Sequence, residues 1–162
     1  MISTISVIGR NWEIGRGGDL VFRGKGELGY FKEVTMGHKV LMGQKTYESL
    51  PRRLEGREYY VASREDFEAP SFVNKVMDLP GFLAEWRESD EEMIVIGGGQ
   101  IYTFALPYAD KLYLTEVDAE EPEADVFFPK FDRQEWQRES VGEGEYDDGL
   151  KYHRYIYTRK RP

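Results

Sequence analysis

Three consecutive glycines, Gly97, Gly98 and Gly99, constrain this chain more than any other feature of its sequence. They follow residues 93–96 (Met-Ile-Val-Ile), which have the composition of a buried strand, and precede residues 100–106, which have that of a short helix. Ordering three glycines costs about 1 kcal/mol each in chain entropy. At a strand-to-helix junction such glycines commonly bring backbone N–H groups close to an anion such as a phosphate. A tight turn that binds no ligand is the alternative.

The rest of the chain alternates short apolar runs with short helical patterns. We expect strands at residues 2–8, 40–42, 58–63, 72–76, 93–96 and 111–117. We expect helices at residues 27–35, 46–50, 80–86 and 100–106. Residues 9–22 have loop composition, and residues 136–141 and 150–157 predict a terminal antiparallel hairpin joined by the polar residues 142–149. The pattern predicts a single α/β domain over residues 1–162, with a mostly parallel sheet, an antiparallel C-terminal edge hairpin and about four flanking helices.

Composition excludes several classes of function. The 162 residues include no cysteine, which rules out a disulfide framework, a thiol nucleophile and a thiolate metal site. The net charge of −8 argues against general nucleic-acid binding. Neither a signal peptide nor an apolar run of about 20 residues is visible, so we expect a cytoplasmic protein that does not bind membranes. His38 and His153 lack the spacing of metal ligands, and we expect no metal site.

Glu27 and Phe31 are the first candidate binding pair. They lie four residues apart in an expected helix and therefore project from one face. A carboxylate beside an aromatic ring could hold a flat heterocycle with an amidine-like pair of N–H groups, because a charged carboxylate accepts two strong hydrogen bonds. An acidic residue in the first turn of a helix is, alternatively, an ordinary solvated partner of the helix dipole.

Two further strand ends have features suited to anions. Residues 41–47 run from a strand through Gly43 into a helix start, as the triple glycine does. Ser63 and Arg64 end another strand with a hydroxyl and a guanidinium, a pair that suits a phosphate monoester. Three such strand ends in one small domain indicate an extended polyphosphate ligand such as a dinucleotide. The glycines do not have the G-x-G-x-x-G spacing, so the usual dinucleotide-binding fold is not indicated.

Short motifs along essentially the whole chain agree in order and spacing with one known family. They are Ile14-Gly15, Phe31-Lys32, residues 40–43 with Thr46, residues 54–57, residues 94–99 with Ile101-Tyr102, residues 112–115 and residues 125–129. In these motifs the chain resembles the dihydrofolate reductases. The resemblance implies an eight-stranded sheet, NADPH as cofactor, and reduction of 7,8-dihydrofolate to tetrahydrofolate in one-carbon metabolism by hydride transfer to pterin C6 and protonation of N5. It also implies that antifolate-type small molecules bind, and we expect a monomer.

The same resemblance implies roles for individual residues. The implied catalytic residues are Glu27, Thr115, Leu20 and Phe22. Glu27 matches the carboxylate that binds the pterin and supports protonation of N5, and Thr115 matches the threonine hydrogen-bonded to that carboxylate. Leu20 lies on the lid and Phe22 directly after it. The implied substrate-binding residues are Ile5, Glu27, Leu28, Phe31, Leu50, Leu54, Arg57, Ile96, Tyr102 and Thr115. The implied cofactor-binding residues are Ser6, Val7, Ile14, Gly15, Leu20, Gly43, Gln44, Lys45, Thr46, Ser63, Arg64, Ile96, Gly98, Gly99, Gln100, Ile101 and Tyr102. Arg57 matches the arginine that holds the α-carboxylate of the substrate's glutamate tail, and a cis peptide is expected between Gly97 and Gly98.

Three departures from the family pattern and two rival functions accompany this resemblance. Val21-Phe22 replaces Pro-Trp, residues 24–26 (Gly-Lys-Gly) replace the segment with a proline before Glu27, and Gln44 replaces an arginine. One rival is the related reductase of riboflavin synthesis, which acts on a ribosyl pyrimidine and would not need Arg57 as a tail-carboxylate ligand. The other rival is a non-catalytic folate- or nucleotide-binding module.

Overall fold

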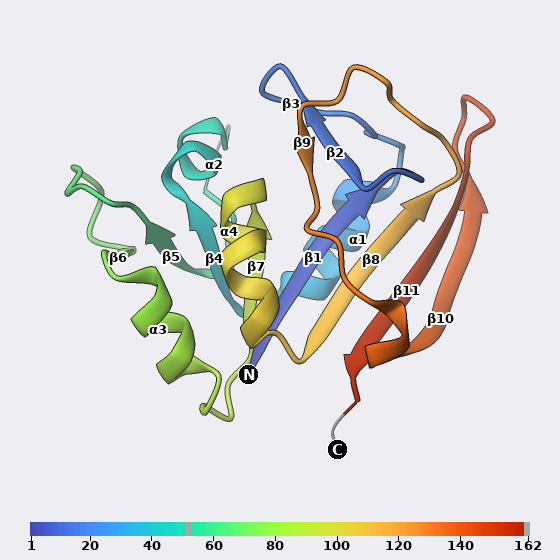
Figure 1. The fold of residues 1–162 in the computed structure, drawn as a ribbon. Helices are drawn as coiled ribbons and strands as arrows, with labels where there is room; N and C mark the ends of the chain where they lie inside the picture. Colours follow the sequence, from blue (N-terminus) through green and yellow to red (C-terminus); the bar gives the residue numbers. More distant parts are fainter. Residues whose placement is uncertain (51–52, 161–162) are drawn as a thin grey trace.

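An eight-stranded sheet forms the centre of the computed structural model, which describes residues 1–50 and 53–160 (Figure 1). Its strand order is β10-β11-β8-β1-β7-β4-β5-β6. The strands are β1 (Ile2–Ile8), β4 (Lys39–Gly43), β5 (Glu58–Ala62), β6 (Val73–Val76), β7 (Met93–Gly97), β8 (Lys111–Val117), β10 (Trp136–Glu145) and β11 (Lys151–Arg159). The pairs from β8 through β6 are parallel, whereas β11 is antiparallel to both β8 and β10. The expected mostly parallel sheet with an antiparallel C-terminal edge is confirmed.

Helices cover both faces of this sheet. They are α1 (Glu27–Thr35), α2 (Gln44–Ser49), α3 (Leu79–Trp86) and α4 (Gly99–Ala105), with the 3-10 turns η1 (Leu106–Tyr108) and η2 (Arg133–Glu135). Figure 1 shows α3 and α4 in front of the sheet and α1 behind it. The α3 helix begins where the Asp78 carboxylate accepts the backbone N–H of Gly81 at 3.2 Å, with Pro80 in the first turn as expected. None of the helices in the described part of the chain is long and apolar enough to cross a bilayer.

Two apolar clusters fill the space between the sheet and its helices. Leu41, Val95 and Leu112 pack with Leu83 of α3 and Tyr102 of α4. The second cluster contains the neighbouring positions Val40, Met42, Tyr59 and Val61, with Tyr47 and Leu50 beside them. Successive strand residues point to opposite faces, so the continuous apolar runs of the sequence serve both clusters. Each such large side chain contributes about 1.5–3 kcal/mol when fully buried.

The prediction that residues 9–22 form a loop is wrong in part. This segment contains β2 (Glu13–Arg16) and β3 (Asp19–Leu20), which form a second sheet with β9 (Val126–Phe127) in the order β3-β2-β9. Gly17 and Gly18 form the turn with φ of 57° and 88°, a region that glycine adopts without strain. The pairing partner β9 lies more than 100 residues away in sequence, so the local composition gives no sign of it.

The terminal hairpin is longer than expected. Strand β10 continues to Glu145 through a register shift between Ser140 and Gly142, and β11 runs from Lys151 to Arg159. Residues 142–145 were assigned to the polar connection, but β10 is an edge strand whose polar side chains can face solvent. The connection that remains between the two strands spans residues 146–150 and contains Tyr146 and Leu150, whose backbones bond to each other at 2.8 Å.

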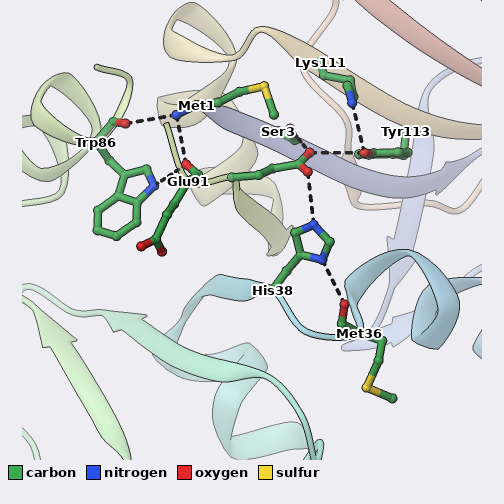
Figure 2. A network of polar contacts seen from close by, with 9 residues as sticks. Met1, Ser3, Met36, His38, Trp86, Glu91, Lys111 and Tyr113 are labelled. Carbon is green, nitrogen blue, oxygen red and sulfur yellow. Dashed lines mark hydrogen bonds and ion pairs between the residues drawn. The ribbon is translucent and has the colours of Figure 1, made fainter. Parts of the chain in front are cut away.

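A polar network joins the amino-terminal ends of the central strands (Figure 2). Glu92, whose side chain is 12% exposed, accepts from Ser3 Oγ at 2.5 Å and from the Tyr113 hydroxyl at 3.1 Å. His38 Nε2 lies 3.3 Å from the same carboxylate, and its Nδ1 lies 3.0 Å from the carbonyl oxygen of Met36. Burial first, and then the charge of Glu92, raise the pKa of Tyr113, so this phenol stays a donor. The network ties β1, β7 and β8 to the start of β4.

Candidate active site

The carboxyl ends of the parallel strands meet at one edge of the sheet and bring the predicted anion-binding segments together. Met42 lies opposite Gly97 in the β4–β7 pairing, and Gly43 lies opposite Ala62 in the β4–β5 pairing. Three strand ends that the sequence separates are therefore neighbours. The peptide bond between Gly97 and Gly98 is cis, as expected.

The two glycine turns face each other across this edge. A Cβ at Gly43 would lie 3.1 Å from Cγ1 of Ile101, and one at Gly98 would lie 3.7 Å from Oγ1 of Thr46. The helices that begin there, α2 and α4, therefore start side by side, each with a glycine at its N-cap. Their free backbone N–H groups give the edge a positive character suited to phosphate.

The third segment suited to anions, Ser63 and Arg64, adjoins the turn at Gly43. Ser63 Oγ lies 2.9 Å from Oε1 of Gln44 and 2.7 Å from the carbonyl oxygen of Glu65. The side chains of Lys45 and Arg64 are exposed nearby, and among the interactions of residues 1–50 and 53–160 neither has an ion-pair partner. Two unpaired cations and a hydroxyl beside two helix starts can hold an anionic group.

The second sheet lies against the triple glycine. A Cβ at Gly99 would approach Cγ1 of Val126 in β9 to 2.8 Å, so only glycine fits at this position. Glu13, 1% exposed, holds the base of the β2–β3 hairpin: its carboxylate accepts the backbone N–H of Asn11 at 2.7 Å and of Glu121 at 2.6 Å. At the hairpin tip, Gly17 donates its N–H to the Asp125 carboxylate at 3.0 Å. Leu20 on β3 remains 59% exposed, so an apolar side chain stands uncovered on this lid-like hairpin.

Glu27 is not a solvated residue of the first helical turn, and that alternative is wrong. Its side chain is only 11% exposed. Oε1 accepts the Tyr146 hydroxyl at 2.6 Å and Arg154 Nη2 at 2.9 Å, while Oε2 accepts Arg154 Nη1 at 3.0 Å. Gly26 precedes the carboxylate with φ of 94°, a left-handed conformation that favours glycine and turns the chain into α1. The carboxylate is therefore held in a two-point ion pair below the start of α1.

Arg154 lies between Glu27 and Thr115. The direct hydrogen bond expected from Thr115 to Glu27 is replaced in the structure by a bond from Arg154 Nη1 to Thr115 Oγ1, 2.8 Å long. The reason lies in the sheet register: Arg154 of β11 is paired with Thr115 of β8, so the fork of the guanidinium reaches both partners.

The surroundings of Glu27 keep its two hydrogen-bond donors, Arg154 and Tyr146, protonated. Burial would lower the pKa of Arg154, but the hydrogen bond and charge of Glu27 outweigh it, and the pKa is raised. Burial and then the hydrogen bond to Glu27 raise the pKa of Tyr146. The Tyr30 ring lies 4.2 Å from the guanidinium carbon of Arg154 and stabilises the cation further.

Arg57 is buried and oriented by its neighbours. Nε donates to Thr35 Oγ1 at 3.1 Å, Nη2 to the carbonyl of Lys32 at 2.8 Å, and Nη1 to the carbonyl of Glu55 at 2.5 Å. A guanidinium has five N–H donors, so roughly two, one on each terminal nitrogen, remain for a ligand. That geometry suits one carboxylate bound at two points.

The apolar residues expected around a substrate differ in exposure. Leu28 is 61% exposed on α1, whereas the side chains of Phe31, Leu50, Leu54 and Ile96 are half-buried. On the sheet, Ile5 and Tyr102 are buried, and the Tyr102 hydroxyl donates to the Ile5 carbonyl at 2.6 Å. Burial raises the pKa of Tyr102.

The remaining expected residues divide between the hairpin and the strand ends. Ser6, Ile14 and Gly15 are buried, and Val7 is half-buried opposite Thr115. Gln100, at the start of α4, is exposed. Phe22 packs close to Gly9 and lines a surface pocket with Gly24 and Tyr146.

Sequence reasoning missed Arg154 and Tyr146. One signal was available for Arg154: it occupies an inward position of a strand otherwise rich in tyrosine and isoleucine, where a buried cation needs an anionic partner. Tyr146 was treated as part of a polar connection, and no local pattern marks it.

Comparison with known proteins also supports the resemblance to the dihydrofolate reductases. The family model for dihydrofolate reductase matches residues 1–161. The chain is 37% identical to a dihydrofolate reductase of Bacillus subtilis over 155 residues, covering 94% of this chain and 89% of that one. It is 41% identical to a Mycobacterium tuberculosis dihydrofolate reductase over 152 residues, covering 90% of each, and 30% identical over 166 residues to one of Staphylococcus haemolyticus, covering 99% of this chain and 95% of that one. The chain therefore belongs to the dihydrofolate reductase family.

Proposed function

We propose that this enzyme reduces 7,8-dihydrofolate to 5,6,7,8-tetrahydrofolate with NADPH, and that Glu27 binds the pterin. The observation that carries the proposal is a buried carboxylate at the start of α1. Its partner Arg154 pairs with Thr115 near the carboxyl end of β8, at the same edge of the sheet as the two glycine turns. A carboxylate in such a site can accept two N–H groups of a flat heterocycle and polarise it.

The substrate would lie between α1 and the sheet. Glu27 would hold the pterin, with Ile5, Leu28, Phe31, Leu50, Leu54 and Ile96 as the apolar walls. Arg57 would hold the α-carboxylate of the glutamate tail through the two N–H groups that its protein partners leave free. Tyr102 and Thr115 would contact the ring region. The negatively charged Glu27 favours the cationic protonated ring, while solvent delivers the proton to N5.

The residues of the strand ends fit NADPH. At Gly43, Gly98 and Gly99 no side chain covers the backbone of the two turns, and the starts of α2 and α4 would bind the pyrophosphate together with Lys45, Thr46 and Ile101. Ser63 and Arg64, with Gln44 beside them, would bind the 2′-phosphate. Ser6, Val7, Ile14, Gly15 and Leu20 would surround the nicotinamide, and Gln100 would flank the phosphates. When bound, the cofactor would supply the hydride that reaches pterin C6, and the chain's contribution is alignment and exclusion of water.

The rival functions fit the site less well. A ribosyl-pyrimidine reductase would share the cofactor residues, but the two free N–H groups of Arg57 suit a carboxylate on the substrate. A non-catalytic module would bind both ligands without reaction. Mixing the protein with NADPH and dihydrofolate separates the three functions: we expect loss of NADPH absorbance that depends on dihydrofolate. Consumption only with the ribosyl pyrimidine, or binding without consumption, would contradict the proposal.

Arg64 should determine preference for NADPH over NADH. We expect Arg64→Ala to weaken NADPH binding by roughly 10- to 100-fold, because a charge-assisted hydrogen bond to phosphate contributes about 1.5–3 kcal/mol. NADH, which lacks the 2′-phosphate, should bind as before. The measurement is the Kd of each cofactor by fluorescence titration, with Arg87→Ala at the end of α3 as a matched control. Equal weakening for both cofactors would exclude Arg64 from the 2′-phosphate site.

A further inference from the structure

The Glu27 carboxylate has almost no capacity left for a ligand. A carboxylate offers roughly four acceptor positions, about two on each oxygen. Tyr146 and Arg154 Nη2 occupy those of Oε1, and Arg154 Nη1 occupies one of Oε2. A pterin that binds through two parallel N–H groups needs one position on each oxygen. One of the present donors must therefore leave Oε1 before such a ligand can bind.

Two glycines leave room for the stacked rings of Tyr146 and Tyr152, the aromatic pair beside this carboxylate. A Cβ at Gly24 would clash with the ring of Tyr146, and a Cβ at Gly144 would clash with the ring of Tyr152. The two rings stack on each other with centroids 4.6 Å apart and an interplanar angle of 25°. Gly24 is one of the positions where the chain departs from its family, so the departure has a physical consequence: it makes room for Tyr146 over Glu27.

Of the two donors, Tyr146 is the one that can move at lower cost. Arg154 lies within β11, paired with Thr115, and its guanidinium packs against the rings of Tyr30 and Tyr152 at 4.2 and 4.6 Å. Displacing it would leave a buried charge without its partner, which is far costlier than displacing a neutral phenol.

The position of Tyr146 also favours movement. It lies in the short connection between β10 and β11, outside the regular pairing of either strand. It borders an open surface pocket lined by Phe22, Gly24, Lys25 and Asp148, which offers space for the ring.

We propose that, in the absence of substrate, the Tyr146 hydroxyl occupies an acceptor position on Oε1 of Glu27, and that it leaves this position when a pterin binds. Tyr146 is therefore a positioning residue that sets substrate affinity. The proposal rests on the proposed function, because it takes Glu27 as the pterin ligand. Arg154 stays in place as the ion-pair partner of the carboxylate, while the phenol competes with the ligand for Oε1.

The test is the affinity of Tyr146→Phe for dihydrofolate with NADP⁺ present, and for a 2,4-diaminopyrimidine, which carries the same amidine-like edge. This variant keeps the ring over Gly24 and removes only the competing hydroxyl. We expect both ligands to bind about tenfold more tightly, which corresponds to about 1.4 kcal/mol, and the change in steady-state kinetics to appear as a lower KM. Tyr60→Phe is the matched control, because it removes a phenol that contacts a carboxylate, Glu58, on β5. We expect no change in that variant.

A second variant displaces the ring without altering its chemistry. Gly24→Ala places a methyl group where the Tyr146 ring lies, so it should also tighten dihydrofolate binding. The double variant Tyr146→Phe, Gly24→Ala should gain no more affinity than the single variant with the larger effect. Equal or weaker binding by Tyr146→Phe would overturn the role of Tyr146. If the unmodified protein neither binds dihydrofolate nor consumes NADPH with it, the proposed function itself fails. If it does both and Tyr146→Phe binds no tighter, only the inference about Tyr146 fails.

Discussion

Glu27→Gln should lower kcat at neutral pH by at least about 100-fold while NADPH binding is retained. The amide keeps the size of the side chain but loses the negative charge that, in the proposed mechanism, favours a protonated pterin. The residues proposed to bind the cofactor phosphates lie at the ends of β4, β5 and β7, whereas the side-chain hydrogen bonds of Glu27 are with Tyr146 and Arg154. The measurements are steady-state turnover of dihydrofolate and the Kd of NADPH.

Glu33→Gln provides the matched control for this variant. Glu33 lies on the same helix but is exposed, so its neutralisation should leave turnover within about twofold. Turnover of Glu27→Gln equal to that of the unmodified protein would remove Glu27 from the reaction. Loss of NADPH binding together with turnover would instead indicate that the variant is not folded.

Arg154→Met should destabilise the protein by about 3–5 kcal/mol, because it leaves the carboxylate of Glu27 buried without its cation. The side chains of the pair are 10% and 11% exposed, so water replaces little of the lost interaction. The same variant removes the donor to Thr115 Oγ1. The free energy of unfolding can be measured by urea denaturation.

The double variant Glu27→Leu, Arg154→Met separates an unpaired charge from lost packing. It removes both charges, and we expect it to recover most of the stability that Arg154→Met loses, since apolar residues often replace a buried ion pair without net cost. Additive losses in the single and double variants would contradict the assignment of Glu27 and Arg154 as one coupled pair. Lys39, which is bonded to exposed Glu58 and Glu91, offers a surface comparison: Lys39→Met should cost less than about 1 kcal/mol.

Much of the fold follows from local patterns in the sequence. The parallel strands and the four helices were predicted within a few residues, because their apolar runs and glycine or proline ends are local signals. The β2–β3 hairpin was not predicted, because its pairing with β9 depends on residues 126 and 127, which are distant in the sequence. In the same way, the extension of β10 to Glu145 depends on its partner strand rather than on its own polar residues.

The candidate site was predicted in part for the same reason. Gly43, Ser63 and the triple glycine lie on adjacent strand ends, as the resemblance implied, because each follows a strand that the sequence marks clearly. The ion pair of Glu27 could not be predicted, since its two residues are 127 positions apart and meet only through the register of β11 with β8. Likewise, the sequence marks Gly24 only as a departure from the family pattern, because Tyr146, the ring that packs against it, lies far away in the chain.

The most direct test of the proposed reaction at Glu27 is the fate of deuterium from NADPH in which both hydrogens at nicotinamide C4 are replaced by deuterium, followed by mass spectrometry of the product. With dihydrofolate as substrate, we predict tetrahydrofolate that carries one deuterium at C6 from the unmodified protein, and at least about 100-fold slower formation of the same product from Glu27→Gln. Formation of unlabelled product, or no product while a ribosyl pyrimidine is reduced, would contradict the proposed function.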